Sequence, residues 1–368
     1  MPRILILCPY PERVAAGQRL KYEQYLDDWR AAGFEVVVSS FMDLTLWSRA
    51  YLPGHHIGKA LGTLQGHLRR LRDLARIRRY DIVYISMWIT PFGTTWLERL
   101  ARVLAKRIIY DIEDNLLTDE GVPKGLRQRL KGQGKARFLL RRADHVLTAS
   151  PFMVDRYRAI NVAGRVTLIY PSVDTDAFRP RETPQMEDKP VIGWTGTFSS
   201  RPYLDLLRPV LQDLARRVDY KLIVIGNFDY ALPGVDLEVL IWSREAEVAQ
   251  MQRLDIGLYP LPDDDWVLGK AGLKVIQYMA FGLPSVSSNI GTATRQVTDG
   301  VNGFLVDTET QWLDVLERLC RNPDLRAHIG AAGRSQAVAH YSRQATSGQY
   351  LAVLRGLIGQ GVSNLELD

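Results

Sequence analysis

Short apolar runs alternate with helical patterns along the whole chain. Between the first two runs, residues Tyr22–Trp29 keep the apolar spacing of a helix, and Gly33 supplies a C-cap. Several runs are apolar at consecutive positions, as expected for parallel strands covered by helices on both faces. The repeated strand–helix–strand unit predicts a doubly wound α/β domain in the first half. Its expected strands are Ile4–Cys8, Phe34–Ser39, Ile82–Ile85, Ile108–Ile112, His145–Thr148 and Val166–Ile169.

A second α/β series follows a stretch, Arg179–Pro190, that is rich in proline and charge and resembles a linker. It contains a helix from Tyr203 to Arg216 and the expected strands Val191–Thr195, Lys221–Ile225, Glu238–Ile241, Ile256–Tyr259, Ser285–Ser287 and Phe304–Val306. We predict two Rossmann-like doubly wound domains, residues 1–175 and 176–340, that face a cleft. A C-terminal helix within 341–368 is expected to pack back on the first domain. Ligands of such domains bind beyond the carboxyl ends of the strands.

Composition narrows the class of protein. The chain has 368 residues, of which 46% are hydrophobic and 24% charged, which fits two globular domains and excludes disordered and collagen-like chains. Cys8 and Cys320 are too far apart in sequence for a metal-binding pair, and two cysteines fit a reducing compartment. The apolar runs are far shorter than the about 20 residues of a membrane span. The first residues are typical of a strand and not of a signal peptide, so we expect a cytoplasmic protein.

The net charge of +6 hides an asymmetry between the two halves. Residues 1–170 carry 28 Lys and Arg against 16 Asp and Glu, whereas the remainder carries 19 against 25. Basic residues cluster at Arg69–Arg79 and Lys124–Arg142, and such clusters attract nucleic acid, phospholipid headgroups or a diphosphate-bearing substrate.

The first basic cluster lies on a helical pattern that carries Leu61, Leu64, Leu68, Leu71 and Ala75 on one stripe and its arginines elsewhere. It has two interpretations. The helix lies on an anionic membrane, or its leucines pack into the core while the arginines face water. The pattern alone favours packing into the core.

The stretch Gly269–Pro284 predicts a helix that Gly282 and Pro284 close. Lys270, Lys274 and Gln277 would share one face of it, and most of the other positions are apolar. Lysines on a buried helix need an anionic partner, and a helix N-terminus favours anions, so a diphosphate is expected here. The alternative is that both lysines reach solvent or pair with Asp263–Asp265.

Two glycine-containing turns follow strands. In the turn Ile192–Arg201, small residues allow a ligand to approach the backbone, and Thr197, Ser199, Ser200 and Arg201 offer hydrogen-bond donors. The N-terminal turn Pro9–Arg19 includes Gly17 and Arg19. A plain turn is the alternative for each.

Carboxylates gather in Tyr110–Asn115, after the fourth expected strand. Asp111 and Glu113 alternate to one face and Asp114 lies beside them. Carboxylates at a strand end can bind sugar hydroxyls, act as a base or hold a metal. Helix capping and ion pairing to the basic helices is the alternative. The histidines show no metal-ligand spacing, and we predict no metal site.

The chain resembles GT-B-fold glycosyltransferases of the retaining family 4 (group 1) type. The resemblance covers most of the chain and is strongest from Asp255 to Val306, where the segments Asp255–Pro260, Lys274–Val286 and Asp299–Val306 stand in the family's order. Thr148–Pro151 and Tyr170–Phe178 resemble the segments that close the family's first domain. The resemblance implies that the second domain holds a nucleotide-diphosphate sugar and the first domain holds the acceptor.

Roles for single residues follow from the turns, the helix and the resemblance together. The donor diphosphate is assigned to Gly196, Thr197, Arg201, Lys270 and Lys274, and the nucleoside to Ile241, Trp242, Ser243 and Gln277. Acceptor or sugar contacts are assigned to Gly17, Arg19, Glu113 and Asp114. Asp111, where many relatives carry a histidine, is expected to orient or deprotonate the acceptor, and Lys270 to stabilise the leaving group. The family's motif has two glutamates, and this chain has Gly269 and Gln277 at those positions.

The expected reaction is transfer of a sugar from a nucleotide-diphosphate sugar to an acceptor hydroxyl with retention, in surface-polysaccharide or glycolipid assembly. Lysines can stabilise the leaving group electrostatically, so no metal or other cofactor is expected to be required. The basic first half suggests an anionic acceptor glycan or lipid-linked sugar, and a peripheral position at the inner membrane face.

Three alternatives stay open at this point. They are a GT-B enzyme with a soluble small-molecule acceptor, a non-catalytic sugar-nucleotide binder and a nucleic-acid binder. The last is disfavoured because the sequence has no recognised nucleic-acid-binding module.

Overall fold

The computed structural model describes residues 1–50, 52–112, 115, 133–182 and 188–359 and divides the chain into two compact units. Unit 1 comprises Met1–Pro171, Gly269–Ala271 and the chain from Thr346 onward. Unit 2 comprises Ser172–Leu268 and Gly272–Ala345. Each unit contains one six-stranded parallel sheet with helices, which confirms the prediction of two Rossmann-like domains. Within the described residues, no helix is both long and apolar enough to cross a membrane.

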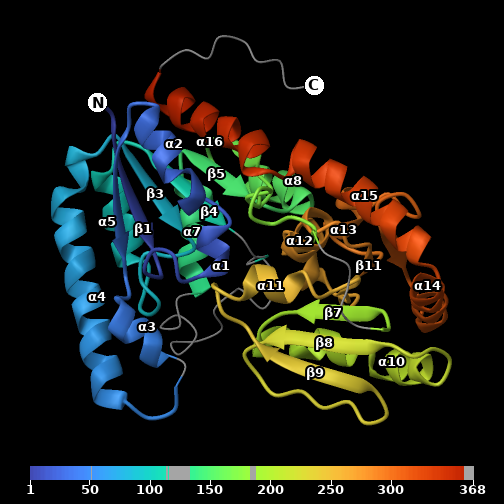
Figure 1. The fold of residues 1–368 in the computed structure, drawn as a ribbon. Coiled ribbons are helices and arrows are strands. Elements are labelled where there is room, and N and C mark those ends of the chain that lie inside the picture. Colours follow the sequence, from blue (N-terminus) through green and yellow to red (C-terminus); the bar gives the residue numbers. More distant parts are fainter. Residues whose placement is uncertain (51, 113–114, 116–132, 183–187, 360–368) are drawn as a thin grey trace. The chain divides into compact units, whose positions relative to one another are not determined.

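The sheet of unit 1 has the strand order β2-β1-β3-β4-β5-β6 (Figure 1). The strands are β1 (Arg3–Cys8), β2 (Glu35–Ser40), β3 (Ile82–Ser86), β4 (Ile108–Ile112), β5 (His145–Thr148) and β6 (Val166–Leu168). Ile4 of β1 lies between Val36 of β2 and Ile82 of β3. The order reverses between β1 and β3, so ligand-binding loops are expected beyond the carboxyl ends of these strands.

Helices cover both faces of this sheet. They are α1 (Ala16–Arg19), α2 (Leu26–Ala31), α3 (Leu44–Ala50), α4 (His56–Arg76), α5 (Trp96–Leu104), α7 (Gln133–Arg142), α8 (Val154–Ile160) and most of α16 (Arg343–Ile358). On one face, Trp29 of α2 and Tyr350 of α16 pack with Tyr84 of β3 in a continuous core. Ser347 of α16 also donates a hydrogen bond to Asp28 of α2 at 3.0 Å. The C-terminal helix therefore completes the core of unit 1.

Helix α4 packs through its glycines and not through the leucine stripe at residues 61–71, so the favoured sequence interpretation of this stripe is wrong. Gly58, Gly62 and Gly66 recur every four residues on the face that meets α3 and the Phe41 ring. A Cβ atom at Gly66 would lie 2.6 Å from the nearest Phe41 ring carbon, which leaves no room for a side chain. The leucine stripe is on the opposite side of the helix and is exposed.

The sheet of unit 2 has the strand order β12-β11-β10-β7-β8-β9. The strands are β7 (Val191–Thr195), β8 (Lys221–Gly226), β9 (Asp236–Ile241), β10 (Ile256–Tyr259), β11 (Ser285–Ser288) and β12 (Phe304–Val306). The helices are α9 (Arg201–Asp205), α10 (Arg208–Ala215), α11 (Glu247–Met251), α12 (Leu273–Ala280), α13 (Ala293–Gln296), α14 (Glu309–Arg321) and α15 (Pro323–His340). Here the strand order reverses between β7 and β10.

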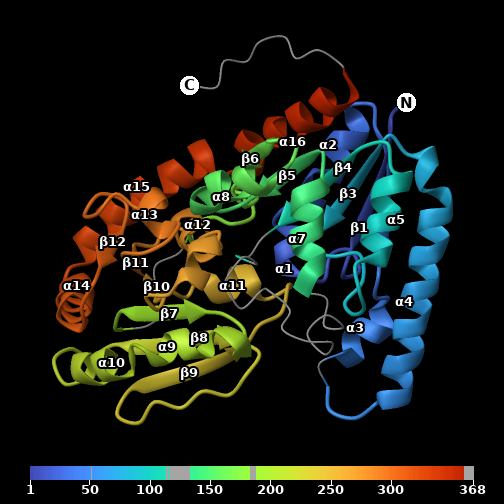
Figure 2. The same cartoon turned by 180° about the vertical axis from the view of Figure 1, so that it is seen from behind.

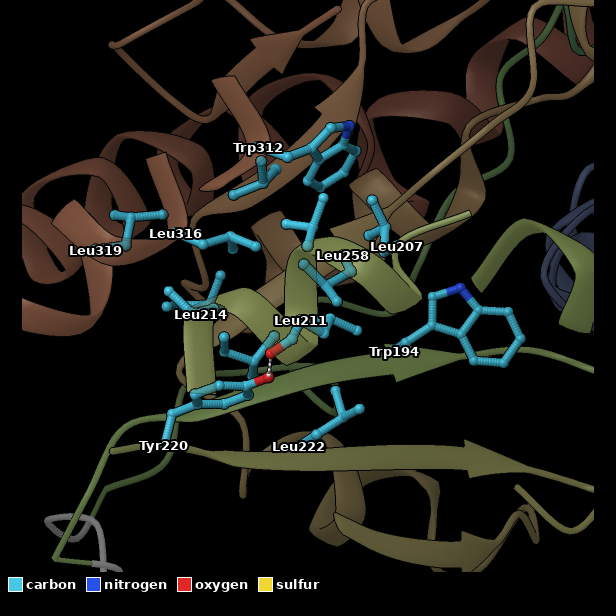
Figure 3. Packing of buried hydrophobic residues seen from close by; sticks show 14 of the residues in the cluster. Trp194, Leu207, Leu211, Leu214, Tyr220, Leu222, Leu258, Trp312, Leu316 and Leu319 are labelled. Atoms are coloured by element: carbon cyan, nitrogen blue, oxygen red, sulfur yellow. Dashed lines mark hydrogen bonds between the residues drawn. The ribbon is translucent and has the colours of Figure 1, made fainter. Parts of the chain in front are cut away.

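The core of unit 2 lies between this sheet and helices α10 and α14 (Figure 3). Leu211 of α10, Leu258 of β10 and Leu316 of α14 are fully buried. The buried Tyr220 hydroxyl has a hydrogen-bond partner, because it donates to the Leu211 carbonyl at 2.8 Å. This packing fixes β7 and β10, and with them the loops at their carboxyl ends.

The helix expected from residue 269 starts later. Gly272 has φ of +70° and a Cβ atom there would lie 2.1 Å from Gln296 Oε1, so α12 begins at Leu273. Lys270 precedes the helix and does not share a helical face with Lys274 and Gln277. The expected helix 203–216 is also divided, because α9 ends at Asp205 and α10 starts at Arg208 with a proline in its first turn.

Candidate functional site

A cationic side chain lies where the strand order of unit 2 reverses. The Lys274 Nζ is 4.6 Å from the centre of the Trp194 ring on β7 and 5.9 Å from that of Tyr259 on β10. The ring faces attract the ammonium and restrict its position. Helix α12 can approach β10 this closely because Gly257 has no side chain, and a Cβ there would lie 2.3 Å from the Tyr278 ring. The arrangement presents a positive charge at the place where such folds bind ligands.

The turn after β7 is closed by its own hydrogen bonds. The Gly196 N–H donates to the Ile225 carbonyl at 2.9 Å, and the Thr197 N–H donates to Ser200 Oγ at 3.1 Å. A Cβ atom at Gly196 would lie 2.2 Å from the Trp194 ring, so only glycine fits at this position. The turn therefore places the Gly196 backbone against the Trp194 ring on which Lys274 lies, and it exposes Thr197, whose hydroxyl bonds to Ser199 Oγ.

Arg201 has a different environment from the one expected. Its guanidinium lies 5.8 Å from the centre of the Tyr230 ring and pairs with Asp205 at 3.5 Å. With Arg208 and Asp229 it lines a separate cavity of about 490 Å³. The Arg201 guanidinium, which the sequence analysis assigned to a diphosphate, therefore already has an anionic partner in Asp205 and an aromatic partner in Tyr230.

The loop after β9 is fixed to its neighbours. The Trp242 N–H donates to the Gly226 carbonyl at 2.8 Å, and Ser243 Oγ accepts from the Ala246 N–H at 3.2 Å. Ile241 is two-thirds exposed at the end of the strand. The loop thus combines a rigid backbone with an exposed apolar side chain, as a flat aromatic ligand requires.

Gln277 of α12 has a partner that the sequence analysis did not name. Its Nε2 donates to Glu247 Oε1 of α11 at 3.2 Å, and both side chains are buried. The pair places a carboxylate next to the position where the family's motif has its second glutamate. Glu247 is 30 residues away in sequence, so no local spacing could have indicated it.

Asp111 is buried in unit 1 and faces protein partners. One carboxylate oxygen pairs with the Lys21 ammonium and the other accepts a hydrogen bond from the Tyr84 hydroxyl. Lys21 and Asp111 are 3% and 1% exposed. Burial together with the Asp111 charge raises the pKa of Tyr84 well above its ordinary value. Asp111 therefore joins β3 and β4 to the segment that follows α1, and its expected role toward the acceptor stays a prediction.

The remaining expected acceptor residues are only partly described. Gly17 and Arg19 lie in the single-turn helix α1, where the buried side chain is that of Gln18. Gln18 Nε2 donates to the Tyr10 carbonyl at 3.1 Å and to Glu23 Oε1 at 2.9 Å. Glu113 and Asp114 lie outside the described residues. Within the described part of the chain, no three His, Cys, Asp or Glu side chains are placed to hold a metal ion.

Comparison with known proteins gives two family matches in succession. A glycosyl transferase 4-like domain matches residues 17–172, and a domain of the glycosyl transferases group 1 matches residues 189–322. The D-inositol 3-phosphate glycosyltransferase of Arthrobacter sp. (strain FB24) is 25% identical over 325 residues, which cover 78% of this chain and 73% of that protein. The GDP-mannose-dependent alpha-(1-6)-phosphatidylinositol monomannoside mannosyltransferase of Mycolicibacterium smegmatis is 28% identical over 250 residues, or 60% of this chain and 65% of that protein.

Solved structures share the fold. Sucrose-phosphate synthase from Thermosynechococcus elongatus has a TM-score of 0.73 at 17% identity and covers 98% of this chain and 100% of its own. Anabaena HepE in complex with UDP and glucose has a TM-score of 0.69 at 15% identity, with coverages of 97% and 100%. With two family models covering most of the chain and two parallel six-stranded sheets, the protein belongs to the group 1 glycosyltransferases of the GT-B fold.

Proposed function

We propose that the protein transfers a sugar from a nucleotide-diphosphate sugar, held by unit 2, to a hydroxyl of a phosphate-bearing acceptor, with retention of anomeric configuration. The observation that carries this proposal is the position of Lys274 against Trp194 and Tyr259 at the reversal of strand order. A cation there stabilises the negative charge that develops on a leaving diphosphate. We also propose that this lysine makes a metal ion unnecessary. Anabaena HepE, which shares the fold, has been solved with UDP and with UDP-glucose, which supports a donor of this class.

The other donor contacts come from elements around Lys274. Gly196 and the exposed Thr197 keep their assignment to the diphosphate, and the loop at Trp242 is assigned to the base. The buried Gln277–Glu247 pair is assigned to the ribose, because an amide and a carboxylate together offer a donor and an acceptor to two hydroxyls. Lys270, which belongs to unit 1, keeps its expected role as a cation for the leaving group.

The acceptor is proposed to be anionic because the positive charge is concentrated in residues 1–170. The names of two relatives contain inositol 3-phosphate and phosphatidylinositol, which are both phosphate-bearing. We favour a lipid-linked acceptor in glycolipid or surface-polysaccharide assembly. A soluble phosphorylated acceptor is the second candidate, and the D-inositol 3-phosphate glycosyltransferases support it.

The proposed reaction needs no protein nucleophile. The bond between the anomeric carbon and the diphosphate oxygen breaks, the acceptor oxygen bonds to the same carbon, and the acceptor proton passes to the leaving phosphate. We assign no step to Asp111, because both of its carboxylate oxygens already have partners, Lys21 and Tyr84.

The test is turnover by the purified full chain with UDP-glucose, UDP-N-acetylglucosamine or GDP-mannose as donor. The acceptors are D-inositol 3-phosphate in one arm and phosphatidylinositol vesicles in the other, each with and without Mg²⁺. We expect release of nucleoside diphosphate only when an acceptor is present, and NMR of the product should show the donor's anomeric configuration. An inverted product contradicts retention, and binding without turnover favours a non-catalytic binder.

A matched pair of variants tests the proposed role of Lys274. Lys274→Met should lower the turnover number about 100-fold, as loss of one charge-stabilising group does in other enzymes. Lys189→Met is the control, because Lys189 of unit 2 pairs with Asp219 and Asp236 at 2.9 Å on the surface. Equal rates for the two variants would contradict the assignment.

A further inference from the structure

Two neighbouring helices of unit 1, α4 and α5, expose apolar side chains that the fold does not use. On α4, Ile57, Leu61, Leu64, Leu68 and Leu71 recur every three or four residues and are 45% to 80% exposed. This spacing places them in one stripe along a helix of 21 residues. The glycines that hold α4 to the protein lie on its other side, so the stripe faces solvent along its whole length. Soluble proteins seldom expose contiguous apolar surface of this kind without a partner.

The apolar surface continues onto α5. This helix lies between α4 and α7, as Figure 2 shows. Trp96, Leu100 and Val103 of α5 are 37% to 76% exposed and recur at the same spacing of three or four residues. The surface thus spans at least two helices, and Trp96 adds the amphipathic ring that is enriched at membrane interfaces.

The exposed charges on helices α4, α5 and α7 have one sign. The only acidic residues of α4, α5 and α7 are Asp73 and Glu98, and both are buried. The exposed basic residues are Arg72, Arg99, Arg137, Arg141 and Arg142 on the helices and Arg78 and Arg79 in the turn that follows α4 (Ile77–Arg79). No exposed carboxylate on these helices offsets the positive charge.

A cavity of about 460 Å³ opens between α5 and α7 at this surface. Arg99, Arg102 and Arg142 line it together with the apolar side chains of Val103 and Phe138. Asp144 also lines the cavity and pairs with Arg102 at 2.6 Å, so Arg99 and Arg142 are the two guanidinium groups proposed to bind a phosphate. Guanidinium groups bind phosphate oxygens well, and the apolar lining suits the adjoining glycerol and acyl carbons of a lipid.

We propose that the outward faces of α4, α5 and α7 dock the protein on an anionic phospholipid bilayer. The leucine stripe of α4 and Trp96 of α5 enter the boundary between headgroups and acyl chains, and the flanking arginines bind lipid phosphates. A second copy of the same face is a poorer partner, because two surfaces of like charge repel each other. The inference stands on this surface alone and does not depend on the donor or acceptor proposed above.

Vesicle flotation of the full chain tests this docking surface. We expect binding to vesicles of phosphatidylcholine mixed with phosphatidylglycerol and little binding to phosphatidylcholine alone. Binding should weaken as salt is raised, because salt screens exposed charges. Equal binding to both vesicle types, or to neither, would overturn the proposal.

Two sets of substitutions separate the apolar and the charged contributions. Leu61→Ser combined with Leu64→Ser and Leu68→Ser should abolish flotation, whereas Leu206→Ser and Val338→Ser, at similarly exposed sites of unit 2, should not. Replacing Arg72, Arg78 and Arg79 by Glu should lower the partition coefficient by about fivefold or more per arginine. Arg355→Glu on α16 is the charge-matched control. If the controls lower binding as much as the test variants do, the proposed surface is wrong.

Sedimentation measured without lipid identifies a protein partner in place of a membrane. The proposal predicts the same mass for the wild type and the leucine variant. A wild-type dimer that the leucine variant dissociates would show that α4 meets a second copy of the chain, and would overturn the proposal. Far-UV circular dichroism and the thermal unfolding midpoint serve as the folding controls for all variants.

Discussion

The buried Lys21–Asp111 pair shows what the sequence could and could not reveal about single residues. An aspartate at the end of a buried strand was visible as a candidate for chemistry. Its partner, Lys21, lies 90 residues earlier and only the fold brings the two together. The contact between Gln277 and Glu247 shows the same limit, because it joins α12 to α11 and no local sequence pattern relates these two helices. Residue types at strand ends can be predicted from sequence, whereas their partners depend on tertiary packing.

Asp111→Asn should destabilise unit 1 without affecting nucleotide binding. The substitution leaves the buried Lys21 ammonium without its counter-charge, which costs about 3–5 kcal/mol for buried pairs. Urea unfolding measures the loss. Asp155→Asn is the control, since its ion pair with Arg158 is exposed and such pairs contribute about 1 kcal/mol or less. A loss no larger than that of the control would contradict the structural role of Asp111.

His145 should make stability depend on pH. Burial, aided by Arg165, lowers the pKa of His145 from 6.5 to about 4. Between these values the unfolded chain binds a proton that the folded chain does not, so the free energy of unfolding falls as pH falls from about 6.5 to about 4. The contribution is at most about 3 kcal/mol. His145→Gln should flatten this slope, since glutamine can still hydrogen-bond Thr167, while the exposed His328→Gln should leave it unchanged.

At the scale of elements, the strands were largely predictable and several features of the helices were not. Runs of consecutive apolar residues mark buried parallel strands, and β1, β4 and β5 lie where the runs predicted them. Helix α4 was misjudged because its leucines form the more conspicuous stripe, whereas the glycines opposite make the packing contact. Helix α12 was predicted to begin too early because a left-handed φ at Gly272 cannot be read from spacing.

Gly66→Ala tests the glycine face of α4. The added Cβ would collide with the Phe41 ring at 2.6 Å, and overpacking of this kind costs about 1–3 kcal/mol. Gly348→Ala in α16 meets no atom within 4 Å and should stabilise the protein by up to about 1 kcal/mol through helix propensity. Denaturation midpoints of the two variants should therefore shift in opposite directions. A stabilised Gly66→Ala protein would refute the packing described for α4.

At the scale of the whole molecule, the alternation of apolar runs predicts the fold class, and the charge asymmetry of the two halves follows from simple counts of residues. The excess positive charge of the first half contributes to the docking surface proposed for unit 1. In unit 2, Lys274 lies against the Trp194 ring at the proposed donor site. The contacts of Lys274 could not be predicted, because Trp194, Tyr259 and Lys274 come from three elements spread over 80 residues.

The most direct test of the account is calorimetric binding of UDP, GDP and dTDP, each with and without Mg²⁺. We predict that one nucleotide binds without requiring the metal, and that Lys274→Met weakens its binding at least about tenfold, or about 1.4 kcal/mol. Lys189→Met should bind that nucleotide as the wild type does. Absence of binding by all three nucleotides, or equal affinity of the Lys274→Met protein and the wild type, would contradict a nucleotide-sugar site at Lys274.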